Sequence, residues 1–291
     1  MVSSAPAEPP YRDREVVLST KHGKERAIGP PLRARLGVHL RVPTDVDTDR
    51  LGTFTGEVAR VGTPLQVAVR KARLGMAATG LPLGLANEGS FGPHPGMPFV
   101  PADHELLLFV DDELGIQVAV ETLSAETNFA HADAATVGAL GADFLRQARF
   151  PSHGLIVRPN AGPEYAPLIK GITTAPALLD AVERCARASS DGLAHLETDM
   201  RAHMNPMRQA VLRALAKRMA QQLATRCPAC ATPGWGAVGV VRGLPCEVCG
   251  GETALVREEI HGCPRCEHRS RLPRGDGRRH ADPGHCPWCN P

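Results

Sequence analysis

The chain has 291 residues, of which 43% are hydrophobic and 22% are charged. This composition is ordinary for a soluble globular protein, and it excludes a fibre, a membrane protein and a wholly disordered chain. Aromatic residues make up only 4% and the net charge is +2. The totals therefore predict neither a broad base-stacking surface nor a generally basic nucleic-acid binder.

Cysteine and charge are distributed unevenly along the chain. Eight of the nine cysteines lie between Cys227 and Cys289, and nine arginines against seven acids from residue 226 onward account for the whole net charge. Between Leu74 and Leu145 there are ten acids and no lysine or arginine, a pattern that favours a nearby cation. The first residues lack the apolar core of a signal peptide. We therefore expect a cytoplasmic protein with no membrane partner, whose thiols bind metal rather than form disulfides.

Runs with strand or helix periodicity alternate through residues 15–225. The predicted strands are 15–20, 37–43, 81–86, 105–111, 116–123, 154–158, 168–172 and 193–198, and the predicted helices are 25–36, 64–79, 133–147, 174–188 and 206–225. We also expect a Gly-rich loop at 87–92 and a hairpin between the fourth and fifth strands. This alternation predicts an α/β domain with a mixed sheet flanked by helices. A disordered lead-in at 1–14 would precede it, and a small C-terminal module at 226–291 would follow.

The C-terminal module contains four C-x2-C pairs, which are separated by fifteen, thirteen and nineteen residues. Each pair places two thiolates on one tight turn, and two pairs complete a tetrahedral Zn²⁺ shell. The sequence thus predicts a double zinc ribbon with two structural Zn²⁺ ions, whose ligands are Cys227, Cys230, Cys246, Cys249, Cys263, Cys266, Cys286 and Cys289. Pairing of consecutive turns would give two ribbons, and interleaved pairing would give one cross-braced unit; the spacing leaves both open.

A basic run in the same module extends from Arg265 to Arg279. Its six arginines are opposed by only Glu267 and Asp276. One interpretation is a patch that contacts the phosphates of a nucleic acid. The alternative is a solvated face in a chain where arginine is far commoner than lysine.

Three polar segments each follow an apolar strand, and ligands of α/β sheets bind at the carboxyl ends of strands. The first segment supplies Thr20, Lys21 and Lys24 next to the start of a helix, a combination suited to a phosphorylated ligand. The second supplies Asn87, and the third supplies Arg201 and Arg208, which could clamp an anion. For each segment the alternative is an ordinary solvated turn or helix face.

Carboxylates near the second segment are candidates for a Mg²⁺ site, because a hard cation prefers carboxylate oxygens and water. Glu88 lies in this segment, and Glu57 lies in the GTFTGE stretch before it. A weaker alternative is a transition-metal site made by His94 with residues 103–105. Cys185 falls on a predicted helix, where a buried apolar role is expected.

Five segments together resemble an uncharacterised bacterial family with a paired cysteine tail. They are TKHGKE, GTFTGE, NEGSFGPHP, ETNF and ETDMRAHMNP, and with the tail they cover nearly the whole chain. This resemblance implies no activity.

Residues 16–90 are also similar to the inosine/xanthosine triphosphate pyrophosphatase superfamily. The similarity rests on Thr20 and Lys24 in VLSTKHGKE and on the run QVAVRKARLGMAATGLPLGLANEGSF. It implies a metal-dependent hydrolase of nucleotides. The first loop is one residue short, and Gln66 stands where the superfamily has a helix carboxylate, so Glu57 or Glu88 would have to replace that metal ligand.

Two hypotheses follow. The first is a Mg²⁺-dependent hydrolase of a nucleotide or related phosphoanhydride, in which Lys24, Glu57 and Glu88 carry the chemistry. The second is a non-enzymatic adaptor whose zinc module binds nucleic acid or a protein, with an α/β domain that binds a ligand without turning it over.

Overall fold

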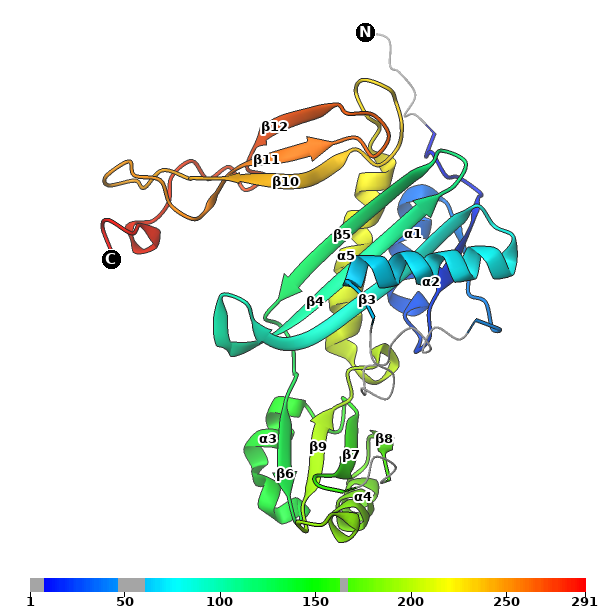
Figure 1. Ribbon diagram of the computed structural model, residues 1–291, viewed down its shortest axis with the longest axis vertical. Helices are drawn as coiled ribbons and strands as arrows, with labels where there is room; N and C mark the ends of the chain where they lie inside the picture. Colours follow the sequence, from blue (N-terminus) through cyan, green and yellow to red (C-terminus); the bar gives the residue numbers. More distant parts are fainter. Residues whose placement is uncertain (1–7, 47–60, 163–166) are drawn as a thin grey trace.

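The computed structural model describes residues 8–46, 61–162 and 167–291, and it contains three β-sheets. Two sheets form the α/β body, and the third belongs to the cysteine-rich module, which projects from one end of the body (Figure 1). The predicted fold class, an α/β protein with a mixed sheet and a small C-terminal module, is confirmed. Within the described ranges, no helix is both long and apolar enough to cross a membrane.

The first sheet has five strands in the order β2-β1-β3-β4-β5. Their bounds are β1 Glu15–Ser19, β2 His39–Arg41, β3 Leu83–His94, β4 Met97–Asp111 and β5 Ile116–Ser124. Strand β1 pairs in parallel with β2 and β3, while β3, β4 and β5 pair antiparallel, so the sheet is mixed. The predicted hairpin between β4 and β5 is confirmed.

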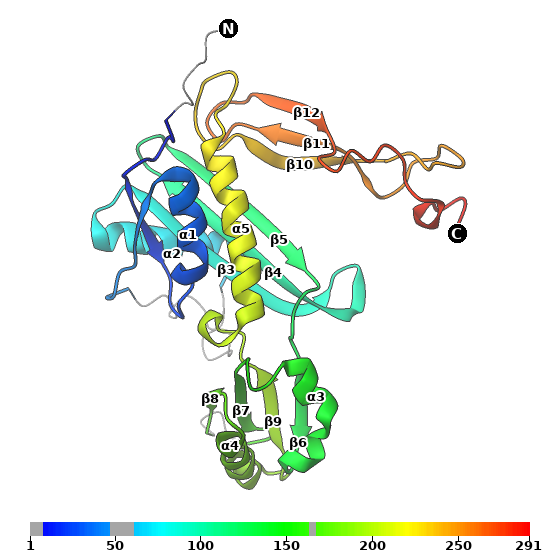
Figure 2. The ribbon, with the colours of Figure 1, turned by 180° about the vertical axis from the view of Figure 1, so that it is seen from behind.

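Helices cover both faces of this sheet. Helix α2 (Pro64–Thr79) lies on one face in Figure 1, and α1 (Glu25–Leu36) and α5 (Pro206–Ala224) lie on the other, as Figure 2 shows. The alternation of the strands explains the two cores. Leu85 and Phe109 pack with α1 and α5, whereas Ala86 and Leu108 pack with α2.

The ends of α2 follow the sequence signals. Thr63 accepts a hydrogen bond from the backbone N–H of Gln66, and the Gln66 side chain accepts one from the Thr63 backbone, which makes a capping box. Gly80 ends the helix in the left-handed region at φ 69°. Gly75 lets the helix approach β1, because a Cβ there would lie 2.0 Å from Ser19 Oγ.

The predicted Gly-rich loop at residues 87–92 is wrong. These residues continue β3, which pairs with β4 from Leu83 to His94. The ladder bonds of a long hairpin override the local turn preference of Gly89 and Gly92, because pairing with β4 continues residue by residue through this segment. The side chains of residues 87–92 therefore alternate between the two faces of the sheet.

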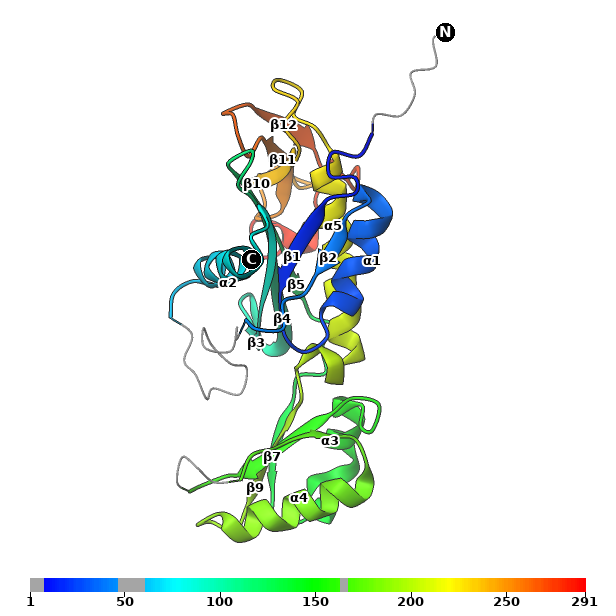
Figure 3. The ribbon, with the colours of Figure 1, turned by 90° about the vertical axis from the view of Figure 1, so that its right-hand side faces the viewer.

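The second sheet has four strands in the order β6-β9-β7-β8 and its own hydrophobic core. Its elements are β6 His131–Ala134, α3 Gly141–Ala148, β7 Leu155–Pro159, β8 Ile169–Ile172, α4 Ala175–Ala188 and β9 Ala194–Thr198. Helices α3 and α4 lie on one side of this sheet (Figure 3). The helix predicted over 133–147 starts only at Gly141, and Asp133 lies in β6 opposite His195. Cys185 is fully buried in this core, as expected, and burial raises the pKa of its thiol.

Tyr11 lies in the segment expected to be a disordered lead-in, but it belongs to the packed domain. Its ring is 3% exposed and meets Phe109 edge-on, and its hydroxyl donates a hydrogen bond to Asp111. Backbone hydrogen bonds from Asp13 to Gly37 and from His39 to Arg14 hold the same segment, so this aromatic anchor acts together with main-chain contacts.

Candidate functional site

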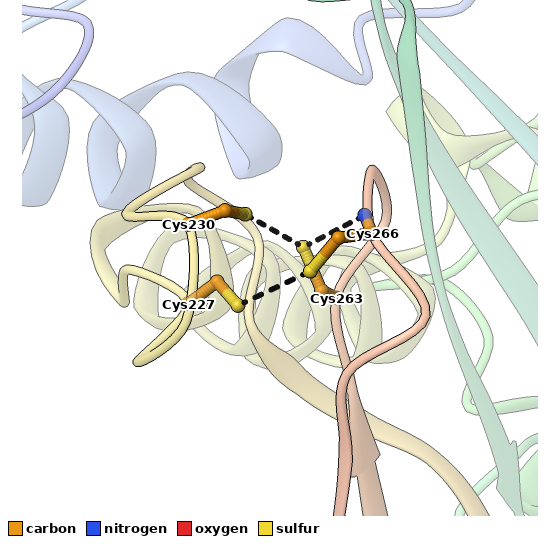
Figure 4. Close-up of side chains that lie close together, drawn as sticks. All are labelled: Cys227, Cys230, Cys263 and Cys266. Carbon is orange, nitrogen blue, oxygen red and sulfur yellow. Dashed lines mark hydrogen bonds between the residues drawn. The ribbon is translucent and has the colours of Figure 1, made fainter.

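The eight cysteines of the C-terminal module form two groups of four. Cys227 and Cys230 meet Cys263 and Cys266, and Figure 4 shows their sulfurs converging from two separate turns. The other group contains the remaining four ligands, Cys246, Cys249, Cys286 and Cys289. Pairing is therefore interleaved, and the module is one cross-braced unit rather than two consecutive ribbons.

The strand topology explains this pairing. Strands β10 (Gly236–Arg242), β11 (Val256–Gly262) and β12 (Arg269–Pro273) form an antiparallel sheet, and each strand runs from one cysteine group to the other. The first and third C-x2-C turns consequently lie at one end of the sheet, near α5, and the second and fourth lie at the far end (Figure 1). Consecutive turns are held apart by the length of a strand.

Both groups have the dimensions that a tetrahedral metal site requires. Sulfur pairs between the two turns are 3.6 and 3.8 Å apart in the first group and 3.5 and 3.8 Å apart in the second. A tetrahedron with Zn–S bonds of about 2.3 Å has edges of about 3.8 Å. Each group can thus hold a metal ion, and four thiolates leave no open position for a reacting water.

In the body, the polar residues gather at the carboxyl end of β1. Lys24, which precedes α1, is 6% exposed, and its ammonium donates to the carbonyl of Asn87 at 3.4 Å. The segment before Lys24 lies against the start of α5, since His22 stacks on His203 and Gln209 donates to the Gly23 carbonyl. The three polar segments singled out from the sequence therefore meet in the fold.

Two buried ion pairs flank Lys24 on opposite faces of the sheet. On the α2 face, Lys71 Nζ lies 2.6 Å from Glu88 Oε1. On the α5 face, Arg208 Nε lies 2.6 Å from Glu105 Oε1, and both side chains are completely buried. Asn87 joins the second pair by donating to Glu105 Oε2 at 2.8 Å. The site thus places three cations beside two carboxylates.

Two ionisable groups here have strongly shifted pKa values. Burial, reinforced by the charge of Arg208, lowers the pKa of Lys24 to about 7. Burial and the neighbouring Glu105 raise the pKa of Asp103 to about 8. Among the described residues, Asp103 Oδ1 and Asn87 Oδ1 are buried and have no hydrogen-bond partner. Perturbed titration in a buried polar cluster is typical of functional sites.

The Mg²⁺ site expected from Glu57 and Glu88 has no support in the structure. Glu57 lies outside the described residues. The Glu88 carboxylate is paired with the Lys71 ammonium, which stands where a bound metal ion would have to lie. Within the described ranges, the groups that could hold a metal ion are the two cysteine groups. The transition-metal alternative also lacks a basis, because His104 points away from Asp103 and contacts Glu121.

The two arginines expected to clamp an anion are each held by a buried carboxylate. Arg201 makes a bidentate contact with Asp199, and Arg208 is bound by Glu105 and by the carbonyl of Met200. Of the residues expected near the phosphates, Thr20 is 8% exposed and hydrogen-bonds the Lys21 carbonyl.

The sequence did not indicate that Lys71 pairs with Glu88, and it placed Asp103 and Glu105 only in the weaker transition-metal alternative. Two of the three carry a usable signal. Lys71 falls on the buried helical stripe with Val67 and Ala68, and Glu105 is buried within β4 directly before the apolar run 106–110. A charged residue at a position where the helix or strand pattern places apolar residues is buried, and buried charges are normally paired with an opposite charge.

The fold and the two cysteine groups define an α/β protein with a C-terminal module that can hold two metal ions. The family described as Domain of unknown function (DUF6671) matches residues 71–291. That match spans more than half of the chain, and the chain belongs to this family. The search of curated proteins returned no match. The comparisons give no support to the likeness to inosine/xanthosine triphosphate pyrophosphatases.

Proposed function

We propose that the α/β body hydrolyses a nucleotide or related phosphoanhydride whose phosphates bind beside Lys24, and that the cysteine groups hold structural Zn²⁺. The observation that carries this proposal is the buried Lys24 ammonium, with a pKa of about 7, between two buried ion pairs. A phosphate dianion beside this group would favour its charged form, so ligand binding would relieve the cost of burying it.

The surroundings of Lys24 suit such a ligand. It precedes the first turn of α1, whose N–H groups favour anions, and it follows the carboxyl end of a parallel strand. Lys71 and Arg208 add positive charge on either side, while Glu88 and Glu105 offset part of that charge. Preorganised cations of this kind stabilise the charge that develops on phosphoryl oxygens.

The zinc assignment rests on the donor set. Four thiolates with tetrahedral spacing prefer Zn²⁺ to the hard cations, and sites without an open position are structural. The metal would supply folding free energy to a module that has little apolar core of its own.

The hydrolase is tested with full-length protein and a panel of nucleoside di- and triphosphates, each with added Mg²⁺, with Mn²⁺ and without either. The informative pair of variants is Lys24→Met and Lys217→Met, since Lys217 is an exposed lysine on α5. We expect the wild type and Lys217→Met to turn over one substrate class and Lys24→Met to be at least about 100-fold slower. Turnover that is no higher in the wild type than in Lys24→Met for every substrate would overturn the proposal.

A nucleic-acid adaptor is the second candidate, and one observation favours it. Strand β12 forms the edge of the third sheet, and Arg269, Arg271, Arg278 and Arg279 are exposed along it and beyond it. Binding of an oligonucleotide that weakens steeply between 50 and 200 mM salt, and is lost when these four residues are replaced by glutamine, would support this candidate. Equal affinity of the variant and the wild type would exclude it.

A further inference from the structure

A cavity of ≈ 210 Å³ lies where the first sheet meets the second. Phe91 of β3 and Phe129 of the crossing between the sheets line it, together with Ile156 of β7 and residues 197–201, which end β9 and follow it. Binding sites for whole drug-sized ligands usually exceed about 300 Å³, so this cavity matches one ring system rather than a complete nucleotide.

The wall of the cavity is aromatic and rigid. The Phe91 and Phe129 rings are stacked, with centroids 6.1 Å apart and planes inclined by 30°. The centroid of the His131 ring lies 6.4 Å from that of Phe129. The Arg208 guanidinium, which pairs with Glu105, lies 5.2 Å from the Phe91 centroid. An aromatic wall of this kind binds flat rings by stacking.

Two charged groups of the cavity, Glu197 and Arg201, offer an acceptor and a donor, whereas Thr198 and Asp199 are engaged in hydrogen bonds within the protein. Within the described ranges, the half-buried Glu197 carboxylate makes neither a hydrogen bond nor an ion pair, and burial raises its pKa. The Arg201 guanidinium is fixed in position by its bidentate contact with Asp199. An ionised carboxylate accepts N–H groups, whereas a guanidinium donates to carbonyl oxygens.

We propose that this cavity binds a flat nitrogen heterocycle of the purine class that presents N–H donors to Glu197 and an oxygen acceptor to Arg201. Stacking on Phe91 and Phe129 supplies contact area, and the two charged groups select the edge of the ring. Arg208 connects this cavity to the Lys24 cluster, so the ring and the phosphates of one ligand can occupy adjoining sites. In this respect the inference rests on the proposed function and specifies its substrate.

The experiment measures binding of guanosine, which has the ring but no phosphate, and of ribose 5-phosphate, which has a phosphate but no ring. Each variant of the cavity has a matched control in the same chain: Phe129→Ala is compared with Phe99→Ala at a fully exposed phenylalanine, and Glu197→Gln with Glu126→Gln at an exposed glutamate. Thermal unfolding of every variant checks the fold, and Phe129→Leu replaces Phe129→Ala where the latter does not fold.

We expect guanosine to bind the wild type and both controls, and its Kd to rise at least tenfold in Phe129→Ala and Glu197→Gln. The Lys24→Met variant should bind guanosine normally and lose ribose 5-phosphate. Absence of guanosine binding, or equal Kd values in cavity variants and controls, would overturn the inference. Guanosine binding without nucleotide hydrolysis would leave the inference intact and refute the hydrolase. Nucleotide hydrolysis whose KM is unchanged when Phe129 or Glu197 is replaced would refute the inference and leave the proposed hydrolase intact.

Discussion

The Arg208–Glu105 pair shows how a single backbone position permits a buried charge. Gly89 lies opposite Glu105 on the same face of the β3–β4 hairpin. A Cβ at Gly89 would lie 2.5 Å from Arg208 Nη2 and 2.6 Å from Glu105 Oε2. The ion pair therefore fills the space that any other side chain at this position would need. Glycine is required here for close approach and not for a turn.

Gly89→Ala should consequently displace the pair and leave two buried charges poorly compensated. We expect a loss of up to roughly 3 kcal/mol in the free energy of unfolding, since removing one partner of a buried ion pair costs about 3–5 kcal/mol and this substitution displaces the pair without removing either partner. Gly92→Ala is the matched control, because the same strand offers open space there. Chemical denaturation of both variants gives the comparison, and equal stabilities would contradict this role of Gly89.

Asp103 should make stability depend on pH. Its folded pKa of about 8 lies above the ordinary value of 3.8 for an aspartate carboxyl. The fold therefore favours the protonated carboxyl. Its contribution to the free energy of unfolding is fully present below pH 3.8 and is lost as pH rises toward 8. Asp103→Asn removes the titration, so the variant should gain stability relative to the wild type as pH rises from 4 to 8. Asp143→Asn, at a side chain that is 91% exposed, should show no such trend. Parallel curves for the wild type and Asp103→Asn would refute the raised pKa.

At the scale of elements, strand length decides which cysteine turns share a metal. Strands β10 and β11 each separate consecutive C-x2-C turns, and antiparallel pairing returns every second turn to the same end of the sheet. The two cysteine groups consequently lie at opposite ends of one small sheet, which buries few apolar side chains of its own, so metal bound to both groups would fix both ends.

Metal stoichiometry of double variants tests this pairing directly. Cys227→Ser with Cys263→Ser damages one site, so the protein should retain one zinc ion; Cys227→Ser with Cys246→Ser damages both sites and should retain none. Native mass spectrometry of the full chain measures the difference. The opposite result would show that consecutive turns pair.

At the scale of the whole molecule, the two sheets of the body are joined through buried amides. Asn205 is fully buried and caps α5 by accepting from the Arg208 N–H, and its amide donates to Asn128 Oδ1 at 2.8 Å. Asn128 in turn donates to the carbonyl of Ala148 at the end of α3. This chain of bonds fixes the junction that contains the proposed ring cavity.

Asn205→Ala should therefore cost more than an ordinary helix cap. Losing a cap costs about 1 kcal/mol, and leaving the Asn128 oxygen buried without its donor adds about 1–3 kcal/mol. Thr63→Ala removes the cap of α2 alone and serves as the control. Urea unfolding should show a clearly larger loss for Asn205→Ala, and equal losses would mean that the amide bridge contributes nothing.

The sequence by itself predicted the helices 25–36 and 64–79 and the four cysteine turns, because capping residues, periodicity and C-x2-C spacing act over a few residues. It was wrong about residues 87–92, where a distant strand outweighs local glycine preference. Only the tertiary structure decided that Lys71 meets Glu88, that Arg208 meets Glu105 across 103 residues, and that cysteine turns interleave. The physical reason is the same in each case. Charged side chains and thiolates are chemically equivalent to others of their kind, so the neighbouring sequence does not indicate which partner each one meets. The order and direction of the strands determine that partner.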